Sequence, residues 1–334
     1  MAESQVPAFF QDLISWYAFE SLAVGHRAGL VEALLAGPGG SSEIAARAGA
    51  DPRATANWLA VMVAAGYATH AAGRFSVADD AVSFLSAQLP GVDSLALLDF
   101  ALALGTRTPQ IVEATRAGAA VPGLFACDFG AAVVRTSAPM YRNMLLRSWI
   151  AATPTVGARL EAGARVVDVG CGDGTAVRVL GAAYPASSFV GVDSDPDAVA
   201  VANRGVSPDN VSFSGVEPDV ADVILVFDSF HHFSRPGELL ARWRAALRED
   251  GVLVVAEPSW SGELDVDSSD RGSVIGLACT FLYCDVEGRT GEPDLEPISP
   301  LDGGRALRAA LAVAGFDDVV AHEVANGYRL YVAR

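Results

Sequence analysis

A glycine-rich run flanked by acidic residues carries the clearest chemistry in this sequence. Residues 166–175 read VVDVGCGDGT, with Asp168 ahead of the glycines. Three glycines stand at alternate positions: Gly170, Gly172 and Gly174. Glycine allows a tight turn and a close approach of backbone to ligand. Asp193 ends the next apolar segment, 19 residues after Gly174, where a carboxylate can bind both hydroxyls of a ribose.

The ligand that this run favours is cationic and free of phosphate. A dinucleotide site has the spacing G-x-G-x-x-G, with backbone N–H groups around a pyrophosphate, whereas this chain has G-C-G-D-G. Asp168 and Asp173 would repel a pyrophosphate, but they suit a ligand with a cationic amino-acid end. S-adenosylmethionine has an ammonium, a sulfonium and a ribose, so it is the favoured cofactor.

The glycine-rich run lies among alternating strands and helices, which predicts how the acids are positioned. Apolar segments predicted as strands occupy residues 164–170, 187–193, 210–215, 221–228 and 251–258. Near-continuous apolar strands that alternate with helices are typical of a doubly wound parallel sheet. In such sheets ligands bind beyond the carboxyl ends of the strands. The predicted fold class is therefore α/β, with a Rossmann-like doubly wound sheet in the C-terminal part.

The N-terminal part is predicted to be mainly helical and winged-helix-like. Residues 8–36 show apolar residues at helical spacing, which Gly25 and Gly29 are expected to break into two helices. Asp51 followed by Pro52 predicts the start of a later helix. Two further helices are predicted at residues 41–47 and 52–65, and the two strands of a wing at residues 67–70 and 74–77.

This winged-helix order raises the alternative of a ligand-sensing DNA-binding regulator, which the charges oppose. The chain has 40 acidic and 23 basic residues and a formal net charge of −17, and an acidic surface repels phosphate backbones. The helix at 53–65 has no basic residue after Arg53, whereas a recognition helix must reach phosphates and base edges. We therefore expect no nucleic-acid partner and interpret this part as a dimerisation module.

The cysteines and apolar runs predict neither a metal site nor a membrane span. Cys127, Cys171, Cys279 and Cys284 form no CxxC pair, and their spacing fits neither a zinc site nor a disulfide scaffold. No apolar run approaches the ~18 residues of a membrane helix. The N-terminus lacks the basic region of a signal peptide. We expect a cytoplasmic protein with free thiols.

In its motifs the sequence resembles class I S-adenosylmethionine-dependent methyltransferases. It resembles more closely the two-domain small-molecule enzymes with an N-terminal winged-helix dimerisation region, which include plant-type and bacterial natural-product O-methyltransferases. DVGCGDGT matches the first motif, and FVGVD, FDSFHHF and LREDGVL match later ones. The resemblance implies a homodimer with a dimerisation domain at 1–100, a helical connector over the active site at 101–160 and a cofactor domain at 161–334.

The resemblance also implies which residues bind S-adenosylmethionine. The implied cofactor-binding residues are Asp168, Gly170, Gly172, Gly174, Asp193, Ser194, Val216 and Phe227. The glycines line the methionine part, and Asp168 acts through the amino group. Asp193 binds the ribose hydroxyls, with Ser194 beside the adenine. The carbonyl of Phe227 faces the methionine amine.

One position departs from the family pattern. The family commonly has a G-D pair after the third strand, whose aspartate holds the adenine amine. This chain has Gly215 followed by Val216, and Glu217 comes one position late. The adenine contact is therefore left either to the backbone of Val216 or to Glu217.

A general base is implied after the fourth strand. Plant-type O-methyltransferases carry H-D-W there, and the chain has His231-His232-Phe233, with His231 in the place of the catalytic histidine. Histidine suits this role because its unperturbed pKa is near neutrality. His232 is the alternative base, and either histidine could instead be a packing residue. Glu257 and Asp228, at the ends of neighbouring strands, are candidates to orient a histidine or to bind substrate.

The acceptor is expected to be a small, aromatic secondary metabolite. The proposed substrate contacts are Tyr17, Asp128, Tyr141 and Trp260. Holding the nucleophile, methyl group and sulfur in line supplies much of the rate, and a base matters most for a hydroxyl. O-methylation is favoured by family frequency, and C-methylation of an aromatic or indole ring comes next. A cyclase that keeps the fold and cofactor but transfers no methyl group is the alternative.

Overall fold

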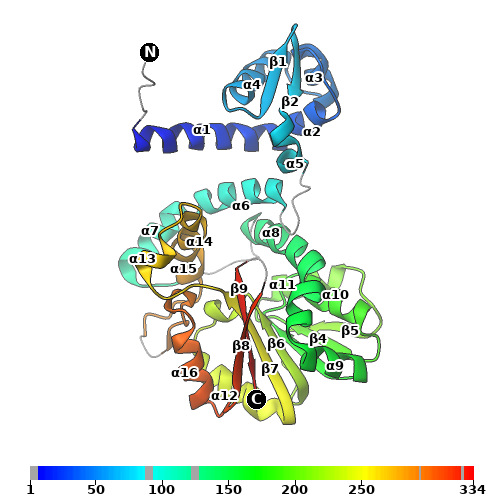
Figure 1. The fold of residues 1–334 in the computed structure, drawn as a ribbon, viewed down its shortest axis with the longest axis vertical. Coiled ribbons are helices and arrows are strands. Elements are labelled where there is room, and N and C mark those ends of the chain that lie inside the picture. Colours follow the sequence, from blue (N-terminus) through cyan, green and yellow to red (C-terminus); the bar gives the residue numbers. More distant parts are fainter. Residues whose placement is uncertain (1–6, 87–92, 122–127, 293–294, 325–326) are drawn as a thin grey trace. The chain divides into compact units, whose positions relative to one another are not determined.

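The structure, a computed structural model, describes residues 7–86, 93–121, 128–292, 295–324 and 327–334. The chain forms two compact units, Met1–Gly105 and Thr106–Arg334. Each unit has a hydrophobic core of its own, and each can be followed by its colour in Figure 1. None of the described helices combines the length and the apolar character needed to cross a membrane.

The N-terminal unit has the predicted helical, winged-helix order. Its elements are α1 (Ala8–Arg27), α2 (Leu30–Leu35), α3 (Ser41–Ala48), α4 (Pro52–Ala64), β1 (Ala68–Ala71), β2 (Arg74–Val77), η1 (Asp79–Ala81), α5 (Val82–Leu85) and α6 (Ser94–Thr106). Strands β1 and β2 pair antiparallel as the wing. The Asp51 carboxylate accepts the Ala54 N–H at 2.8 Å, so the predicted Asp-Pro start of α4 is confirmed.

One predicted helix break is wrong. Helix α1 continues through Gly25 and ends at Arg27, and the chain turns at Gly29, which has φ 72°. A Cβ at position 25 would collide with the Trp58 ring. The indole N–H of Trp58 donates to the Ser21 carbonyl at 3.0 Å. Gly25 therefore lets α4 pack closely against α1, and its role is contact rather than termination.

The C-terminal unit contains a seven-stranded sheet in the order β5-β4-β3-β6-β7-β9-β8. Its strands are β3 (Arg165–Val169), β4 (Ser188–Val192), β5 (Val211–Ser214), β6 (Ala221–Phe227), β7 (Leu247–Pro258), β8 (Val319–Val324) and β9 (Tyr328–Ala333). The strands from β5 to β7 pair parallel, and β9 pairs antiparallel with β7 and β8. The predicted α/β class is confirmed. The strand order reverses at β3, which therefore borders the switch point where ligands bind.

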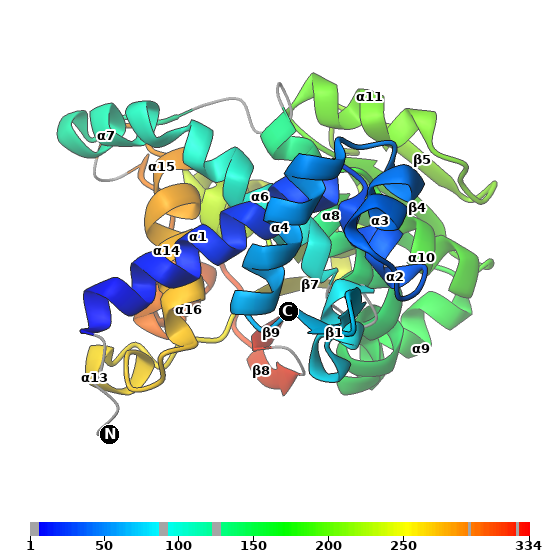
Figure 2. The same cartoon turned by 90° about the horizontal axis from the view of Figure 1, so that it is seen from above.

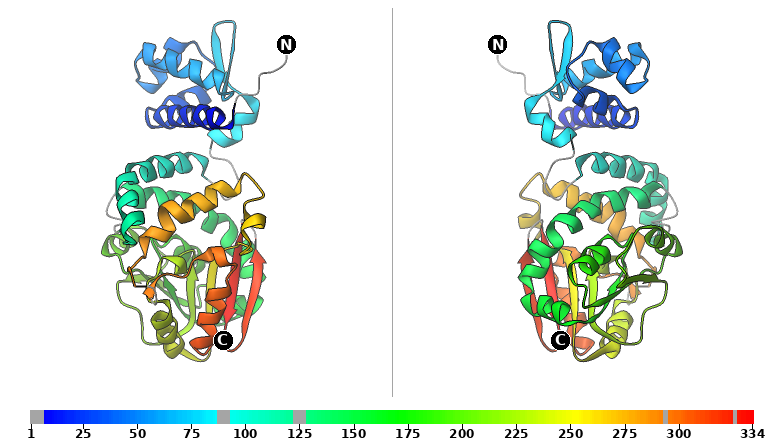
Figure 3. Two further views of the ribbon diagram at one scale, coloured as in Figure 1. Left: turned by 90° about the vertical axis from the view of Figure 1, so that its left-hand side faces the viewer. Right: turned by 90° about the vertical axis from the view of Figure 1, so that its right-hand side faces the viewer.

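Helices cover both faces of this sheet (Figures 1 and 2). The helices of the C-terminal unit are α7 (Thr108–Ala117), α8 (Asp128–Met144), η2 (Leu145–Ile150), α9 (Pro154–Ala162), α10 (Thr175–Ala183), α11 (Pro196–Arg204), η3 (Phe230–His232), α12 (Pro236–Ala246), α13 (Leu264–Asp267), α14 (Ser273–Cys279), η4 (Thr280–Cys284), α15 (Asp285–Glu287), η6 (Pro300–Asp302) and α16 (Arg305–Val313). Side chains of β6 alternate between two cores, with Val223 in one and Ile224 in the other. Figure 3 shows the same layers from both sides.

Candidate active site

The glycine-rich loop after β3 depends on glycine at each of its three positions. Gly170, Gly172 and Gly174 have φ of 75°, 55° and 78°, a region that side chains disfavour. The backbone N–H of Gly170 donates to the Val192 carbonyl at 2.8 Å, which joins the loop to the end of β4. A Cβ at Gly170 would lie 2.7 Å from the Ser229 hydroxyl. The loop is therefore tightly packed against the chain that follows β6.

Two predicted cofactor acids lie together at this loop. The Asp193 carboxylate accepts the backbone N–H groups of Gly172 and Asp195, each at 3.0 Å. Asp168 is buried, and burial, followed by the nearby Asp193 charge, raises its pKa to about 8. A carboxyl group in this state gains stability as an anion when a cation binds beside it.

The third acid of the run has a local structural role. The Asp173 carboxylate accepts the backbone N–H of Thr175 at 2.9 Å and its hydroxyl at 2.7 Å. Both oxygens are thus bonded at the start of α10, where an anion is stabilised by unpaired N–H groups. Asp173 is thus bonded locally to Thr175, and its role beside a cationic ligand stays a prediction.

The residues expected near adenine lie after β4 and β5. Ser194 is exposed, and Val216 is exposed with its N–H donating to the Ser214 hydroxyl at 3.0 Å. Glu217 accepts from Arg242 at 2.6 Å and from the Trp243 indole at 2.9 Å. Both carboxylate oxygens of Glu217 are bonded to α12. Of the two options, the geometry therefore favours the backbone of Val216 over Glu217 for the adenine contact.

A buried histidine–carboxylate pair forms at the carboxyl ends of β6 and β7. His231 Nδ1 lies 2.6 Å from Glu257 Oε2, and Glu257 Oε1 accepts the Phe230 N–H at 3.1 Å. His231 and Glu257 are only 4% and 5% exposed. Burial alone would lower the pKa of His231, but Glu257 and Cys284 outweigh it and raise that pKa well above its usual value. The pair therefore binds a proton tightly.

The neighbouring His232 has the opposite electrostatics. Its ring lies 4.2 Å from the His231 ring and 4.9 Å from that of Tyr283, measured between centroids. Burial and the charge of His231 lower the pKa of His232 well below its usual value. Its Nδ1 atom is buried with no hydrogen-bond partner. His232 is therefore a neutral imidazole.

The turn that carries these histidines is joined to its surroundings at three points. The Ser229 hydroxyl donates to the Val169 carbonyl at 3.2 Å, next to the glycine-rich loop. Asp228 has the left-handed φ of 53°, and its carboxylate accepts the Tyr328 hydroxyl at 2.8 Å. Burial raises the pKa of Asp228 to about 6. The Tyr141 hydroxyl donates to the Phe227 carbonyl at 3.2 Å, so Tyr141 reaches the atom expected to face the methionine amine.

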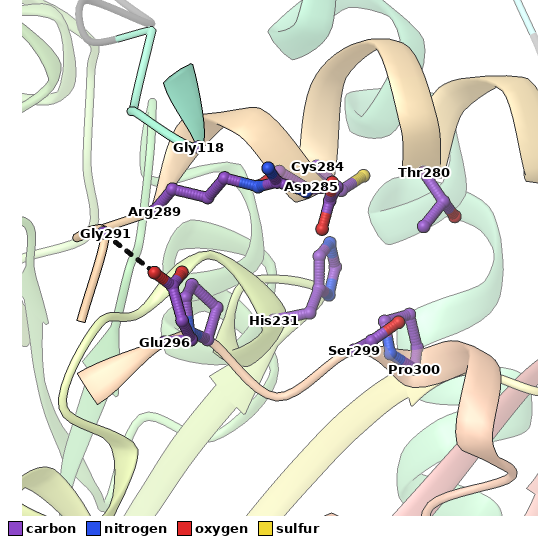
Figure 4. A pocket seen from close by; sticks show the side chains of 11 residues that line it. Gly118, His231, Thr280, Cys284, Asp285, Arg289, Gly291, Glu296, Ser299 and Pro300 are labelled. Atoms are coloured by element: carbon purple, nitrogen blue, oxygen red, sulfur yellow. Dashed lines mark hydrogen bonds and ion pairs between the residues drawn. The ribbon is translucent and has the colours of Figure 1, made fainter. Parts of the chain in front are cut away.

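A cavity of about 450 Å³ opens beside His231. Figure 4 shows the His231 ring turned toward Cys284 and Asp285, with Arg289 beside them. Glu296, on another wall of the cavity, accepts the Gly291 N–H at 2.8 Å. Sequence reasoning missed Cys284 and Arg289, because no motif surrounds them.

Of the predicted substrate residues in the unit that holds this cavity, Tyr141 and Trp260 do not line it. Tyr17 is 60% exposed on α1, and the side chain of Asp128 lies outside the described residues. Trp260 is half-buried, and its ring lies so close to Gly276 on α14 that a Cβ there would be 2.7 Å away. Tyr141 belongs to α8, and its hydroxyl donates to the carbonyl of Phe227 at the end of β6.

Two protein-family models match the sequence of this chain. A family model described as a methyltransferase domain matches residues 141–320, more than half of the chain. The chain belongs to this methyltransferase family. A second model, described as an Rv2258c-like winged HTH domain, matches residues 20–84. The predicted family, the enzyme class and the two-part fold are thus confirmed.

Individual relatives agree with this assignment over different lengths. Trans-aconitate 2-methyltransferases of Methylobacterium nodulans and Mycobacterium tuberculosis are 34% and 32% identical over 107 and 101 residues. Each match covers 30% of this chain and 40% or 39% of the relative. The chain thus spans about two fifths of the length of the curated relatives it matches.

Three similar solved structures cover nearly the whole chain. Human N-acetylserotonin methyltransferase in complex with S-adenosylmethionine is 18% identical, with a TM-score of 0.68 over 100% of this chain and 99% of that one. A putative O-methyltransferase of Nostoc punctiforme is 16% identical, with a TM-score of 0.73 over 99% of both. The mitomycin 7-O-methyltransferase MmcR is 17% identical, with a TM-score of 0.71 over 98% and 96%. At these identities the likeness establishes the fold alone.

Proposed function

We propose that this chain is an S-adenosylmethionine-dependent methyltransferase for a small aromatic acceptor, with His231 as its general base. The observation that carries the proposal is the His231–Glu257 pair. The turn that carries His231 is hydrogen-bonded through Ser229 to Val169, the last residue of β3, next to the glycine-rich loop. Base and cofactor loop thereby lie at one edge of the sheet, as methyl transfer to a hydroxyl requires.

The proposed reaction needs one nucleophile and one proton acceptor. The acceptor oxygen attacks the methyl carbon, the carbon–sulfur bond breaks, and neutral S-adenosylhomocysteine leaves. The hydroxyl proton passes to Nε2 of His231, because Glu257 holds Nδ1. The Glu257 carboxylate stabilises the imidazolium that forms, and it fixes the ring's orientation.

The cofactor side of the proposal rests on the two acids and the glycines. Asp193 already bonds the backbone of the loop, and its position at the end of β4 suits the two ribose hydroxyls. Asp168, buried beside it, attracts the ammonium of the methionine part, directly or through water. Human N-acetylserotonin methyltransferase, which has a similar fold, forms a complex with S-adenosylmethionine, and this supports the choice of cofactor.

The acceptor is proposed from the size and position of the cavity. A volume of about 450 Å³ lies within the range of small-molecule sites, and His231 lines it. A hydroxyl acceptor is favoured because a buried base would serve a weak nucleophile best. C-methylation of an aromatic or indole ring remains the second choice.

We also propose a homodimer formed through the N-terminal unit. Large apolar side chains of α1 are exposed, among them Phe9, Ile14, Trp16 and Tyr17 at 53–71%, and such a patch marks an interaction site. The exposed residues of α4 include Arg53 as their one basic residue, which disfavours DNA as the partner. Light scattering after gel filtration at micromolar concentration should give the dimer mass, and a monomer would contradict this part.

The decisive experiment measures S-adenosylhomocysteine release with a panel of phenols and other aromatic acceptors. His231→Ala should slow turnover by about 10²-fold or more, the usual contribution of general base catalysis, while calorimetry finds unchanged S-adenosylmethionine affinity. His70→Ala, at an exposed histidine of β1, is the matched control. Consumption of an acceptor without S-adenosylhomocysteine would favour a cyclase, and no S-adenosylmethionine binding would reject the proposal.

A further inference from the structure

We propose that His231, His232 and Cys284 form a binding site for a zinc-class divalent cation, with one coordination position open to the cavity. One ligand atom from each of the three residues lies within 4.8 Å of the others. In a tetrahedral zinc site with bonds of about 2.0–2.3 Å, such atoms are about 3.5 Å apart. Small side-chain rotations therefore close the described cluster around one ion.

His231 is already oriented as a metal ligand. Its Nδ1 lies 2.6 Å from the Glu257 carboxylate, and the ring also hydrogen-bonds the side chain of Cys284. Histidine ligands commonly donate their other N–H to a carboxylate, which fixes the ring and raises its basicity. Glu257 in turn accepts the Phe230 N–H at 3.1 Å, so the orienting carboxylate is itself held in place.

His232 supplies the observation that points independently to a ligand. Its Nδ1 is buried and has no hydrogen-bond partner, although buried ring nitrogens normally find one. A bound cation would satisfy this nitrogen.

Cys284 completes a soft set of ligands. It is a free, half-buried cysteine at the end of the π-helical turn η4 and lines the cavity with His231. Two imidazoles and one thiolate suit zinc better than magnesium or calcium. The ligands come from segments about fifty residues apart, so no CxxC-like spacing exposes the site in the sequence, where no metal is expected.

Three protein ligands beside a cavity leave a fourth position for solvent or another small ligand, as in catalytic zinc sites. Binding releases the Cys284 thiol proton to solvent and places the ion on the thiolate. It also excludes a proton from Nε2 of His231. His231 therefore cannot bind the metal ion and act as a base at the same time. This consequence rests on the proposed function, but the metal site itself does not depend on that function.

The test uses the full chain after treatment with a chelator, titrated with Co²⁺ and then with Zn²⁺. We expect the near-ultraviolet absorption of a cobalt–thiolate bond and its loss when Zn²⁺ displaces the cobalt. Cys284→Ser should abolish this absorption and weaken zinc binding by more than about tenfold. Loss of a residue that only hydrogen-bonds to a metal ligand already costs about tenfold in affinity, and loss of a ligand should cost more. Cys279→Ser, at a free, half-buried cysteine outside the cluster, is the matched control and should change neither.

The wild-type spectrum needs no variant, so it decides the matter even if Cys284→Ser fails to fold. Absence of the thiolate absorption in the wild-type chain would overturn the proposal, and so would an equal absorption in folded Cys284→Ser. S-adenosylmethionine binding is measured in parallel by calorimetry. A chain that binds this cofactor but no cobalt would reject the metal site and leave the proposed function intact.

Discussion

Replacing Glu257 with glutamine removes one buried charge from the candidate site and nearly preserves its shape. In the wild-type chain, burial would lower the pKa of His231 and the Glu257 carboxylate raises it. Without that charge, burial dominates and the pKa falls. Since a base must be neutral to accept a proton, the rising limb of activity with pH is expected to move to lower pH.

The magnitude follows from the 2.6 Å contact between the ring and the carboxylate. A hydrogen bond to a charged group contributes about 1.5–3 kcal/mol, which corresponds to a shift of about one to two pH units. The substitution also removes stabilisation of the imidazolium in the transition state. At high pH, where activity no longer rises with pH, turnover would therefore be slower by about 10- to 150-fold. The amide also offers a single accepting oxygen to two N–H groups, so a stability loss of about 1–3 kcal/mol is expected.

The assay is kcat/KM against pH by S-adenosylhomocysteine release, with thermal melting to monitor folding. Glu287→Gln is the control, because Glu287 is a half-buried carboxylate paired with Arg107 at 3.2 Å, and its loss should lower stability without moving the pH limb. An unchanged limb in folded Glu257→Gln would refute the assignment of His231 as the titrating base.

Three further outcomes test the cofactor side. Asp193→Ala should weaken S-adenosylmethionine binding by about 10- to 150-fold in calorimetry, the equivalent of one charged hydrogen bond; unchanged affinity would contradict the ribose assignment. Gly170→Ala should lower the melting temperature more than Gly49→Ala does. Both substitutions force alanine into left-handed backbone, which costs about 1–2 kcal/mol. Only at Gly170 would the new Cβ also lie within 3 Å of Ser229. Equal decreases in melting temperature would argue against that packing. Asp168 holds its proton up to about pH 8 in the folded chain and only to about 4 when unfolded. The free energy of unfolding should therefore fall as pH rises between these values, and cofactor binding near pH 7 should release a proton, detectable by calorimetry in buffers of different ionisation enthalpy. No proton release would contradict a contact between Asp168 and the cationic ligand.

The fold could be predicted because its signals are local and periodic. Apolar runs marked β3, β4 and β6, and Asp51 marked the start of α4, since a strand's burial and a helix cap each depend on a few neighbouring residues. Gly25 misled because its reason lies in Trp58, 33 positions away. A glycine that permits a contact and one that ends a helix look alike in sequence.

The candidate site was predictable to a lesser degree. The glycines and His231 lie in contiguous motifs, and Glu257 was identifiable because it ends a strand beside β6. Cys284 and Arg289 reach the cavity only because η4 and the residues after it pack near the η3 turn. Such long-range packing leaves no periodic trace. The roles proposed for Tyr17, Asp128, Tyr141 and Trp260 remain predictions.

The left-handed backbone of Asp228 links the stability of the chain to the chemistry of its site. An L-residue there costs about 1–2 kcal/mol that glycine would avoid, and aspartate and asparagine tolerate the position best among the others. Asp228→Gly would relieve this backbone cost, but it also removes the carboxylate that accepts from Tyr328, a loss of about 1–3 kcal/mol. Asp228→Asn would keep a hydrogen-bond acceptor and discard only the charge. A directed-evolution experiment at this one codon would therefore separate what the turn needs from what the reaction needs.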